Sequence, residues 1–238
     1  MNPERPNAYE QLSPEAAARV DAVCDGFEKA WRAARSGAEM PQLANFLNGC
    51  DENERTILAH GTCLDQREIQ MALDAGVWFA HNPRSNMNNQ VGYAPVGQFG
   101  RRSVLGTDGI SGDMFEETRL AFLKGRDTLS PLGAGDWLRV LARGQRLATE
   151  AFGIELGALI PGSAADLVIL NYNPPTPMTT DNLPGHLIFG MNSGLIDAVM
   201  VNGRFIVRDG HPAFDEEGLY ARARETAAKL WGRYVEID

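Results

Sequence analysis

The sequence predicts an α/β protein in which short buried strands alternate with helices. Three apolar runs, at 56–59, 77–80 and 103–106, are too short for helices and lack the polar alternation of a half-exposed strand. Such runs are typical of strands that are buried on both faces, as in a parallel sheet. Helical patterns lie between them, and strands joined by helices form parallel sheets in α/β folds.

Composition and charge narrow the classes of protein that fit. The 238-residue chain is 44% hydrophobic and 22% charged, which is ordinary for a folded globular protein. Its net charge of −9 argues against a nucleic-acid partner, because phosphate binding needs a basic surface. We expect no membrane partner, since no apolar stretch is long enough to span a bilayer and the first residues lack a secretory signal. Cys24, Cys50 and Cys63 form no CxxC pair, so we expect a cytoplasmic enzyme or binding protein without a disulfide framework.

The first part of the chain, residues 1–55, is predicted to be an N-terminal helical segment. Apolar residues recur at helical spacing through 13–36, where Ser13 is a good N-cap and Pro14 suits the first helical position. A second short helix is expected at 41–47. Two helices with one apolar face each are typical of a pair that docks on a folded domain.

The strand and helix patterns continue as far as residue 152. Helices are predicted at 65–75, 115–124 and 136–152. The segment 82–94 holds four Asn residues and has no clear period, so it is predicted to be a polar loop. Strand, loop and helix therefore repeat through residues 56–152.

Beyond this region the pattern becomes that of β-structure. Residues 166–170 are predicted to be a strand. Residues 196–201 and 204–208 are predicted to form a hairpin through Asn202-Gly203, since Asn-Gly between two β-runs is a strong hairpin signal. A terminal helix with an apolar stripe is expected over 217–234.

Each of the three apolar runs is closely followed by an ionisable side chain. These residues are His60, His81 and Asp108. Taken singly, each has an ordinary alternative, a hydrogen-bonded structural histidine or an aspartate that starts a loop. Active sites of (β/α)8 barrels, however, are built at the carboxyl ends of successive strands. Because three such endings occur in a row, we favour catalytic roles for all three residues.

Short motifs follow one another in a fixed order along the chain. They are Ala59-His60-Gly61, His81-Asn82-Pro83-Arg84-Ser85-Asn86, Gly92-Tyr93-Ala94-Pro95, Leu105-Gly106-Thr107-Asp108-Gly109 and Met114-Phe115-Glu116-Glu117. Together they resemble the second half of the amidohydrolase superfamily, in its chlorohydrolase, cytosine-deaminase and S-adenosylhomocysteine-deaminase branch. The later motifs Pro174-Pro175-Thr176-Pro177, Gly185-His186 and Phe189-Gly190 look most like aminohydrolases associated with selenium metabolism.

The resemblance implies a metal-dependent hydrolase that acts on carbon–nitrogen bonds other than peptide bonds. It implies a divalent metal, zinc ahead of iron, and a small amidine-like or heterocyclic substrate that loses ammonia. Asp108 would bind the metal, take a proton from the metal-bound water and pass it to the leaving amine. His60 would orient and polarise the substrate, and His81 would match the histidine after strand 7.

The chain also departs from the family pattern. All four of its histidines lie at or beyond residue 60, so the His-x-His pair after strand 1 and the histidine after strand 5 are absent. Catalytic zinc takes about three protein ligands, and Asp108 is the one matched ligand. Three strands are predicted where a barrel needs eight. The metal site is therefore expected to be incomplete in this chain.

The resemblance thus implies an incomplete (β/α)8 TIM-like barrel, with its last strands only, over residues 56–152. Part of a composite β-sandwich would follow over 153–214, and a C-terminal helix over 215–238. An enzyme of this kind would need a complementary chain or a homo-oligomer to act on its small-molecule substrate. The alternative hypothesis is a catalytically incompetent truncated remnant, or a binding partner without the metal-binding histidines.

The polar residues of the segment 82–94 have two interpretations. Asn82, Ser85 and Asn86 would lie at the carboxyl face of the sheet, where they could bind substrate. Polar loop residues also stabilise loops by bonding nearby backbone, and the sequence favours neither interpretation.

Other polar residues have simpler expected roles. A buried, packed thiol is favoured for Cys63 over a metal ligand. Glu116 and Glu117 begin a helix, where carboxylates favour the positive end of the helix dipole, so a capping role is favoured over catalysis. Structural or solvent-exposed roles are favoured for His186 and His211, since neither follows a barrel strand.

Overall fold

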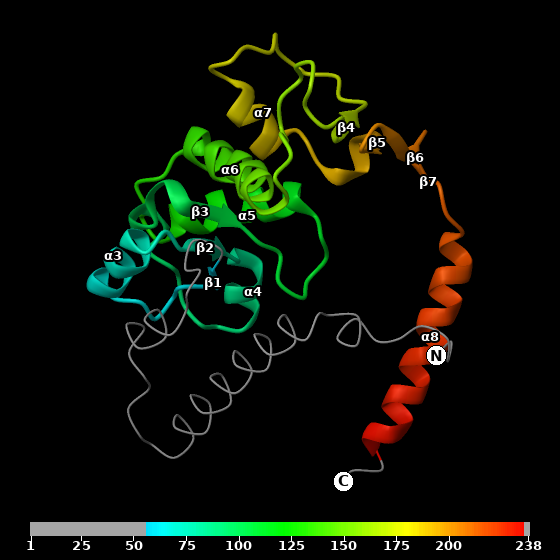
Figure 1. Ribbon diagram of the computed structural model, residues 1–238, viewed down its shortest axis with the longest axis horizontal. Helices are drawn as coiled ribbons and strands as arrows, with labels where there is room; N and C mark the ends of the chain where they lie inside the picture. Colours follow the sequence, from blue (N-terminus) through cyan, green and yellow to red (C-terminus); the bar gives the residue numbers. More distant parts are fainter. Residues whose placement is uncertain (1–55, 236–238) are drawn as a thin grey trace. The chain divides into compact units, whose positions relative to one another are not determined.

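The computed structural model describes residues 56–235 (Figure 1), so the helices predicted within 1–55 lie outside the described residues. The chain divides into two compact units. Among the described residues, one unit holds Thr56 and Asp65–Val77, and the other holds Ile57–Leu64 and the chain from Trp78 onward.

Three parallel strands form the first sheet, as the apolar runs predicted. They are β1 (Ile57–Ala59), β2 (Trp78–His81) and β3 (Ser103–Leu105), in the order β1-β2-β3. The expectation that all three are buried was wrong for the first strand, where Ile57 is 49% exposed. In the register, Ala80 lies opposite Ala59 on one side and Val104 on the other. Trp78, Phe79 and His81 of the central strand are buried, and the ring of Phe79 stacks on Phe99 with centroids 4.4 Å apart.

Two long helices follow β3, close to their predicted positions. They are α5 (Met114–Asp127) and α6 (Ala134–Phe152). Asp113 caps α5 by accepting hydrogen bonds from the backbone N–H groups of Phe115 and Glu116. Gly153 ends α6 in the left-handed region, with φ 68°. The buried side chains of α6 are Trp137 and Val140, and this helix packs against β3.

The other unit contains α3 (Gln66–Asp74), which lies within the predicted helix 65–75. A capping box begins this helix, because Asp65 accepts from the N–H of Glu68 while Glu68 accepts from the N–H of Asp65. Ile69 and Ala72 are its buried residues.

The segment predicted to be a polar loop contains a helix, so that prediction was wrong over part of its length. α4 (Pro83–Asn88) begins with proline at its first position, where a missing N–H is tolerated. Two short 3-10 helices follow, η3 (Val96–Gln98) and η4 (Gly100–Arg102). The buried residues of α4 are mostly polar, so hydrogen bonds replace the apolar period that a sequence pattern detects.

An antiparallel sheet of four strands forms the later part of the chain. Its strands are β4 (Leu167–Leu170), β5 (Ile196–Val201), β6 (Arg204–Arg208) and β7 (His211–Pro212), in that order. The predicted hairpin is confirmed, because Asn202 (φ 48°) and Gly203 (φ 75°) both take the left-handed conformation that a two-residue type I′ turn requires.

Between β4 and β5 lie two short elements that the sequence pattern did not reveal, α7 (Leu183–Phe189) and η5 (Ser193–Leu195). His186 of α7 is buried, and its ring nitrogens face the hydroxyls of Tyr172 and Thr176 at 2.7 and 3.3 Å. This contact agrees with the structural role expected for His186, and His211 is exposed.

The chain ends in α8 (Glu216–Val235), close to the predicted helix. Its stripe of large apolar side chains is exposed rather than packed: Leu219, Tyr220, Leu230, Trp231 and Tyr234. Within residues 56–235, no helix combines the length and apolar character that crossing a membrane would require.

Candidate active site

His60 is the first residue after β1, and the sheet fixes its backbone. Its N–H donates to the carbonyl of Ala80 on β2 at 2.9 Å. Both His60 (φ 66°) and Gly61 (φ 65°) take left-handed backbone conformations. A Cβ at Gly61 would lie 2.7 Å from the ring of Phe99, so this turn requires glycine.

Asp108 follows β3 in a similar way. The N–H of Gly106 donates to the carbonyl of His81 at 3.0 Å and extends the ladder towards Asp108. Asp108 also has a positive φ, of 52°. A left-handed backbone is costly for a residue with a side chain, and it persists where the surroundings over-determine it.

The two predicted residues His60 and Asp108 come together at the carboxyl ends of the strands. Their nearest side-chain polar atoms, Nε2 of His60 and Oδ2 of Asp108, are 3.7 Å apart, and both side chains are more than one third exposed. An exposed pair at this distance contributes little to stability. Its exposure leaves both groups accessible to a small molecule.

Residues of α4 hold this pair in place. The hydroxyl of Ser85 donates to Oδ2 of Asp108 at 2.6 Å. Nδ1 of His60 lies 2.7 Å from Oδ1 of Asn86. Because an amide oxygen only accepts, this contact places the ring proton of neutral His60 on Nδ1 and leaves Nε2 towards Asp108.

The same contacts set the charge of Asp108. The Ser85 hydroxyl, the N–H of Gly109 and the neighbouring His60 lower the pKa of the Asp108 carboxyl below its ordinary value. Asp108 is therefore a carboxylate at neutral pH.

His81, the third residue predicted at a strand end, lies in a different environment. Its ring is buried, stacked on Trp137 with centroids 5.7 Å apart and edge-on to Tyr93. Neither ring nitrogen has a hydrogen-bond partner within residues 56–235. Burial, and the nearby His60, lower the pKa of His81 to about 3, so the ring is neutral at neutral pH.

Of the three residues predicted to bind substrate, two contact the candidate pair and one does not. The side chains of Ser85 and Asn86 hydrogen-bond Asp108 and His60, so they contact the candidate pair rather than nearby backbone. Asn82 is buried, and its Oδ1 has no hydrogen-bond partner among the described residues. Cys63 is exposed, so the expectation of a packed thiol was wrong.

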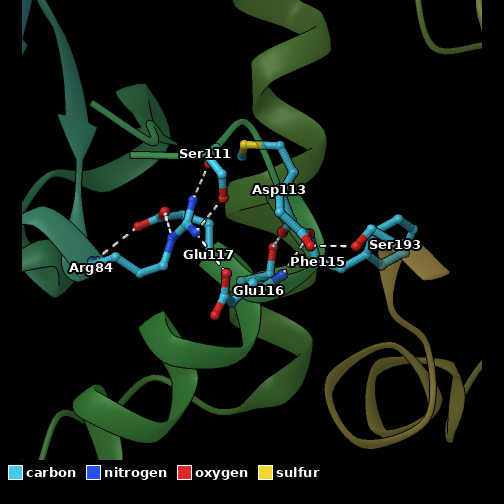
Figure 2. A network of polar contacts seen from close by, with 9 residues as sticks. Arg84, Ser111, Asp113, Phe115, Glu116, Glu117 and Ser193 are labelled. Carbon is cyan, nitrogen blue, oxygen red and sulfur yellow. Dashed lines mark hydrogen bonds and ion pairs between the residues drawn. The ribbon is translucent and has the colours of Figure 1, made fainter. Parts of the chain in front are cut away.

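A buried ion-pair network next to the site was missed from the sequence (Figure 2). Arg84 on α4 is paired with Glu117 and with Glu116, the latter at 2.7 Å, and Glu117 is fully buried. Glu116 and Glu117 lie in the first turn of α5, as expected, but Asp113 makes the cap hydrogen bonds and the two glutamates bind Arg84. No local signal pairs two residues 33 positions apart, so only the fold reveals this contact.

The described residues can be tested against the metal site that the resemblance implies. Within residues 56–235, no group of three or more His, Cys, Asp or Glu side chains is placed to hold a metal ion. His60 and Asp108 offer two donors, whereas catalytic zinc takes three protein ligands and a water. These residues alone do not fit a zinc site.

Comparison with known proteins identifies the family. The sequence profile of the amidohydrolase family matches residues 28–206, which is more than half of the chain. The chain therefore belongs to the amidohydrolase family. A mixed α/β fold with strand-end histidine and aspartate is consistent with this assignment.

Two of the curated relatives that the chain resembles are named as deaminases. The chain is 33% identical over 186 residues to 5'-deoxyadenosine deaminase from Methanothermobacter thermautotrophicus, a match that covers 75% of this chain and 44% of the relative. It is 31% identical to 5-methylthioadenosine/S-adenosylhomocysteine deaminase from Syntrophomonas wolfei, covering 78% and 45%. The chain spans less than half of the length of these relatives.

Solved structures resemble the fold. An adenosine deaminase from Xanthomonas campestris with bound zinc matches with a TM-score of 0.70 and 26% identity, covering 84% of this chain and 47% of that one. Atrazine chlorohydrolase from Arthrobacter aurescens, in complex with zinc, matches with a TM-score of 0.63 and 25% identity, covering 82% and 45%.

Proposed function

We propose that this chain forms part of an aminohydrolase that releases ammonia from a small amidine-like or heterocyclic substrate. The observation that carries the proposal is the His60–Asp108 pair, 3.7 Å apart at the ends of β1 and β3. Relatives named as deaminases of 5'-deoxyadenosine and of methylthioadenosine or S-adenosylhomocysteine favour an aminopurine nucleoside as the substrate.

The roles of the two residues follow from their protonation. Asp108 is a carboxylate, so it can accept a proton from the attacking water and return it to the departing amine. His60 presents Nε2 to the same space, because Nδ1 is engaged by Asn86. A substrate nitrogen or hydroxyl there would be oriented by His60 while Asp108 moves the proton.

We also propose that a second chain completes the site. The described residues offer only two donors for a metal, and the chain matches less than half of the length of each relative. Both observations support this proposal. In this view residues 56–152 contribute the last strands of a (β/α)8 barrel and residues 153–214 part of a β-sandwich. A complementary chain or another copy would supply the remaining ligands for a divalent metal, zinc ahead of iron. The motifs at 174–190 favour the branch associated with selenium metabolism.

A second candidate is a binding module without catalysis. The shortage of metal donors among the described residues favours it. In that case the His60–Asp108 pair would bind a small polar ligand and turn nothing over.

The test measures ammonia release from adenosine, 5'-deoxyadenosine and an aminotriazine, with zinc present. The full chain is assayed alone and after co-expression with the part of the Methanothermobacter relative that it does not cover. We expect ammonia in the co-expressed sample, and a loss of at least about 10²-fold in Asp108→Asn, which keeps the size but removes the negative charge.

Asp127→Asn, at an exposed carboxylate on α5, is the matched control and should leave the rate unchanged. A change below about tenfold in Asp108→Asn would contradict the proposed role. Binding of adenosine by the full chain with no ammonia under either condition would favour the binding module instead.

A further inference from the structure

Arg84 occupies a special place in the chain, directly before the two residues that hold the candidate pair. Ser85 binds Asp108 and Asn86 binds His60. The side chain of Arg84 is 6% exposed, and a buried charge of this kind is costly unless it is paired and hydrogen-bonded. The partners of Arg84 are therefore the groups that fix the start of α4 in place.

Glu117 accepts two hydrogen bonds from Arg84, one from its backbone and one from its side chain. Its Oε1 accepts from the backbone N–H of Arg84 at 3.1 Å, and its Oε2 accepts from Nε of the side chain. Glu117 lies in the first turn of α5 and is fully buried. One carboxylate thus fixes both the backbone and the side chain of Arg84 relative to α5, as Figure 2 shows.

The rest of the guanidinium binds the segment that follows Asp108. Nη1 donates to the hydroxyl of Ser111 at 3.1 Å, and Nη2 donates to the backbone carbonyl of the same residue. Nη1 also donates to Glu116 at 2.7 Å. A planar fork with five N–H donors can make these contacts together, which an ammonium cannot do.

We propose that Arg84 is a positioning residue for the His60–Asp108 pair. It joins the start of α4, which carries Ser85 and Asn86, to the segment that begins at Asp108. His60 and Asp108 both have left-handed backbones, which persist only where neighbouring contacts over-determine them. The catalytic meaning of this role rests on the proposed function, but its geometry can be tested without any activity.

The competing explanation is that Arg84 and Glu117 serve stability alone. Removing one partner would leave a buried charge unpaired, so loss of the fold in a single variant would not separate the two explanations. Replacing both partners by apolar residues of similar volume is often tolerated. The double variant Arg84→Met/Glu117→Leu can therefore distinguish a positioning role from a role in stability alone.

The readout is the ring tautomer of His60 in the full chain, labelled with ¹⁵N-histidine. The measurement is made in an alkaline buffer, where exposed imidazoles are neutral. His60→Gln assigns the signal, and the exposed His211 gives an unconstrained reference in the same spectrum. In the native sequence we expect the proton on Nδ1 of His60. In the folded double variant we expect this preference to be lost and the ratio to approach that of His211.

Arg102→Met/Glu150→Leu is the matched control, because it removes another arginine–glutamate pair of the same chain. It should leave the His60 tautomer unchanged. A folded Arg84→Met/Glu117→Leu protein with the native His60 tautomer would overturn the proposal.

If that double variant does not fold, Arg84→Lys decides. Lysine keeps a positive charge for Glu117 but cannot also reach both acceptors of Ser111. A native His60 tautomer in Arg84→Lys would overturn the proposal, and a mixed tautomer would support it. Where the co-expressed enzyme releases ammonia, either variant should lower kcat more than it raises KM. Absence of ammonia in the native enzyme would count against the proposed function only, because the spectrum is independent of turnover.

Discussion

The parallel sheet and the antiparallel sheet differ in how they use apolar side chains. Phe79 in the centre of the parallel sheet is completely buried, whereas Val168 and Phe205 of the antiparallel sheet are 55% and 40% exposed. The parallel sheet, whose strands β2 and β3 are mostly buried, carries the candidate pair at its carboxyl ends. A well-packed support of this kind can hold polar groups in costly conformations, while the second sheet has apolar surface that the described residues do not cover.

The largest expected effect is on the free energy of unfolding. Equal effects of matched substitutions in the two sheets would contradict the difference in their burial. Phe79→Ala should lower the free energy of unfolding by about 3–5 kcal/mol, because it opens a cavity beneath Phe99. Phe205→Ala should lower it by less than about 1.5 kcal/mol, since that ring is already partly in water. Urea unfolding of both variants makes the measurement, and equal losses would contradict the contrast.

The buried His81 should make the parallel-sheet region sensitive to acid. The pKa of His81 is lowered from 6.5 to about 3, so the unfolded chain binds a proton below pH 6.5 that the folded chain does not accept until about pH 3. The free energy of unfolding should therefore fall as the pH drops through this window, by at most about 1.4 kcal/mol per pH unit.

His81→Phe keeps an aromatic ring between Tyr93 and Trp137 but cannot bind the proton. Urea unfolding across the window should show a shallower pH dependence in this variant. His211→Phe, at an exposed position, is the control and should keep the native slope. Identical slopes for the native chain and His81→Phe would show that His81 is not the group responsible.

The smallest expected effect concerns the stability of the hairpin turn in the antiparallel sheet. Gly203→Ala should cost about 1–2 kcal/mol, because Gly203 has a φ of 75° in the hairpin turn. Gly144→Ala is the matched substitution inside α6, where an added Cβ meets nothing within 4 Å. It should stabilise the protein by up to about 1 kcal/mol. Thermal unfolding of the two variants should show shifts of opposite sign, and shifts of the same sign would contradict this.

The sequence predicted the elements whose signal is local. Three apolar runs gave the parallel strands, and Asn202-Gly203 gave the hairpin, because each pattern depends on neighbouring residues only. α4 and α7 were missed, since the first buries polar residues and the second contains Pro184 and Gly185 near its start. Their helical form depends on contacts with distant parts of the chain.

The candidate site, like the fold, was predictable only where its signal is local in the sequence. His60 and Asp108 stood out because parallel strands bring their carboxyl ends to one edge. His81 carried the same signal, but it is the last residue of β2 and is buried against Trp137, because position at a strand end does not determine which way a side chain points. The pairing of Arg84 with Glu117 required the fold itself.

The strand order of the parallel sheet has a consequence for amide hydrogen exchange. β2 is paired on both sides, whereas β1 and β3 are each paired on one side within the described residues. The amides of β2 should therefore be among the slowest in the chain to exchange, and an edge strand can open while the centre stays closed. His60 and Asp108 are carried by the two edge strands, so the lifetime of their contact is set by local opening rather than by global unfolding.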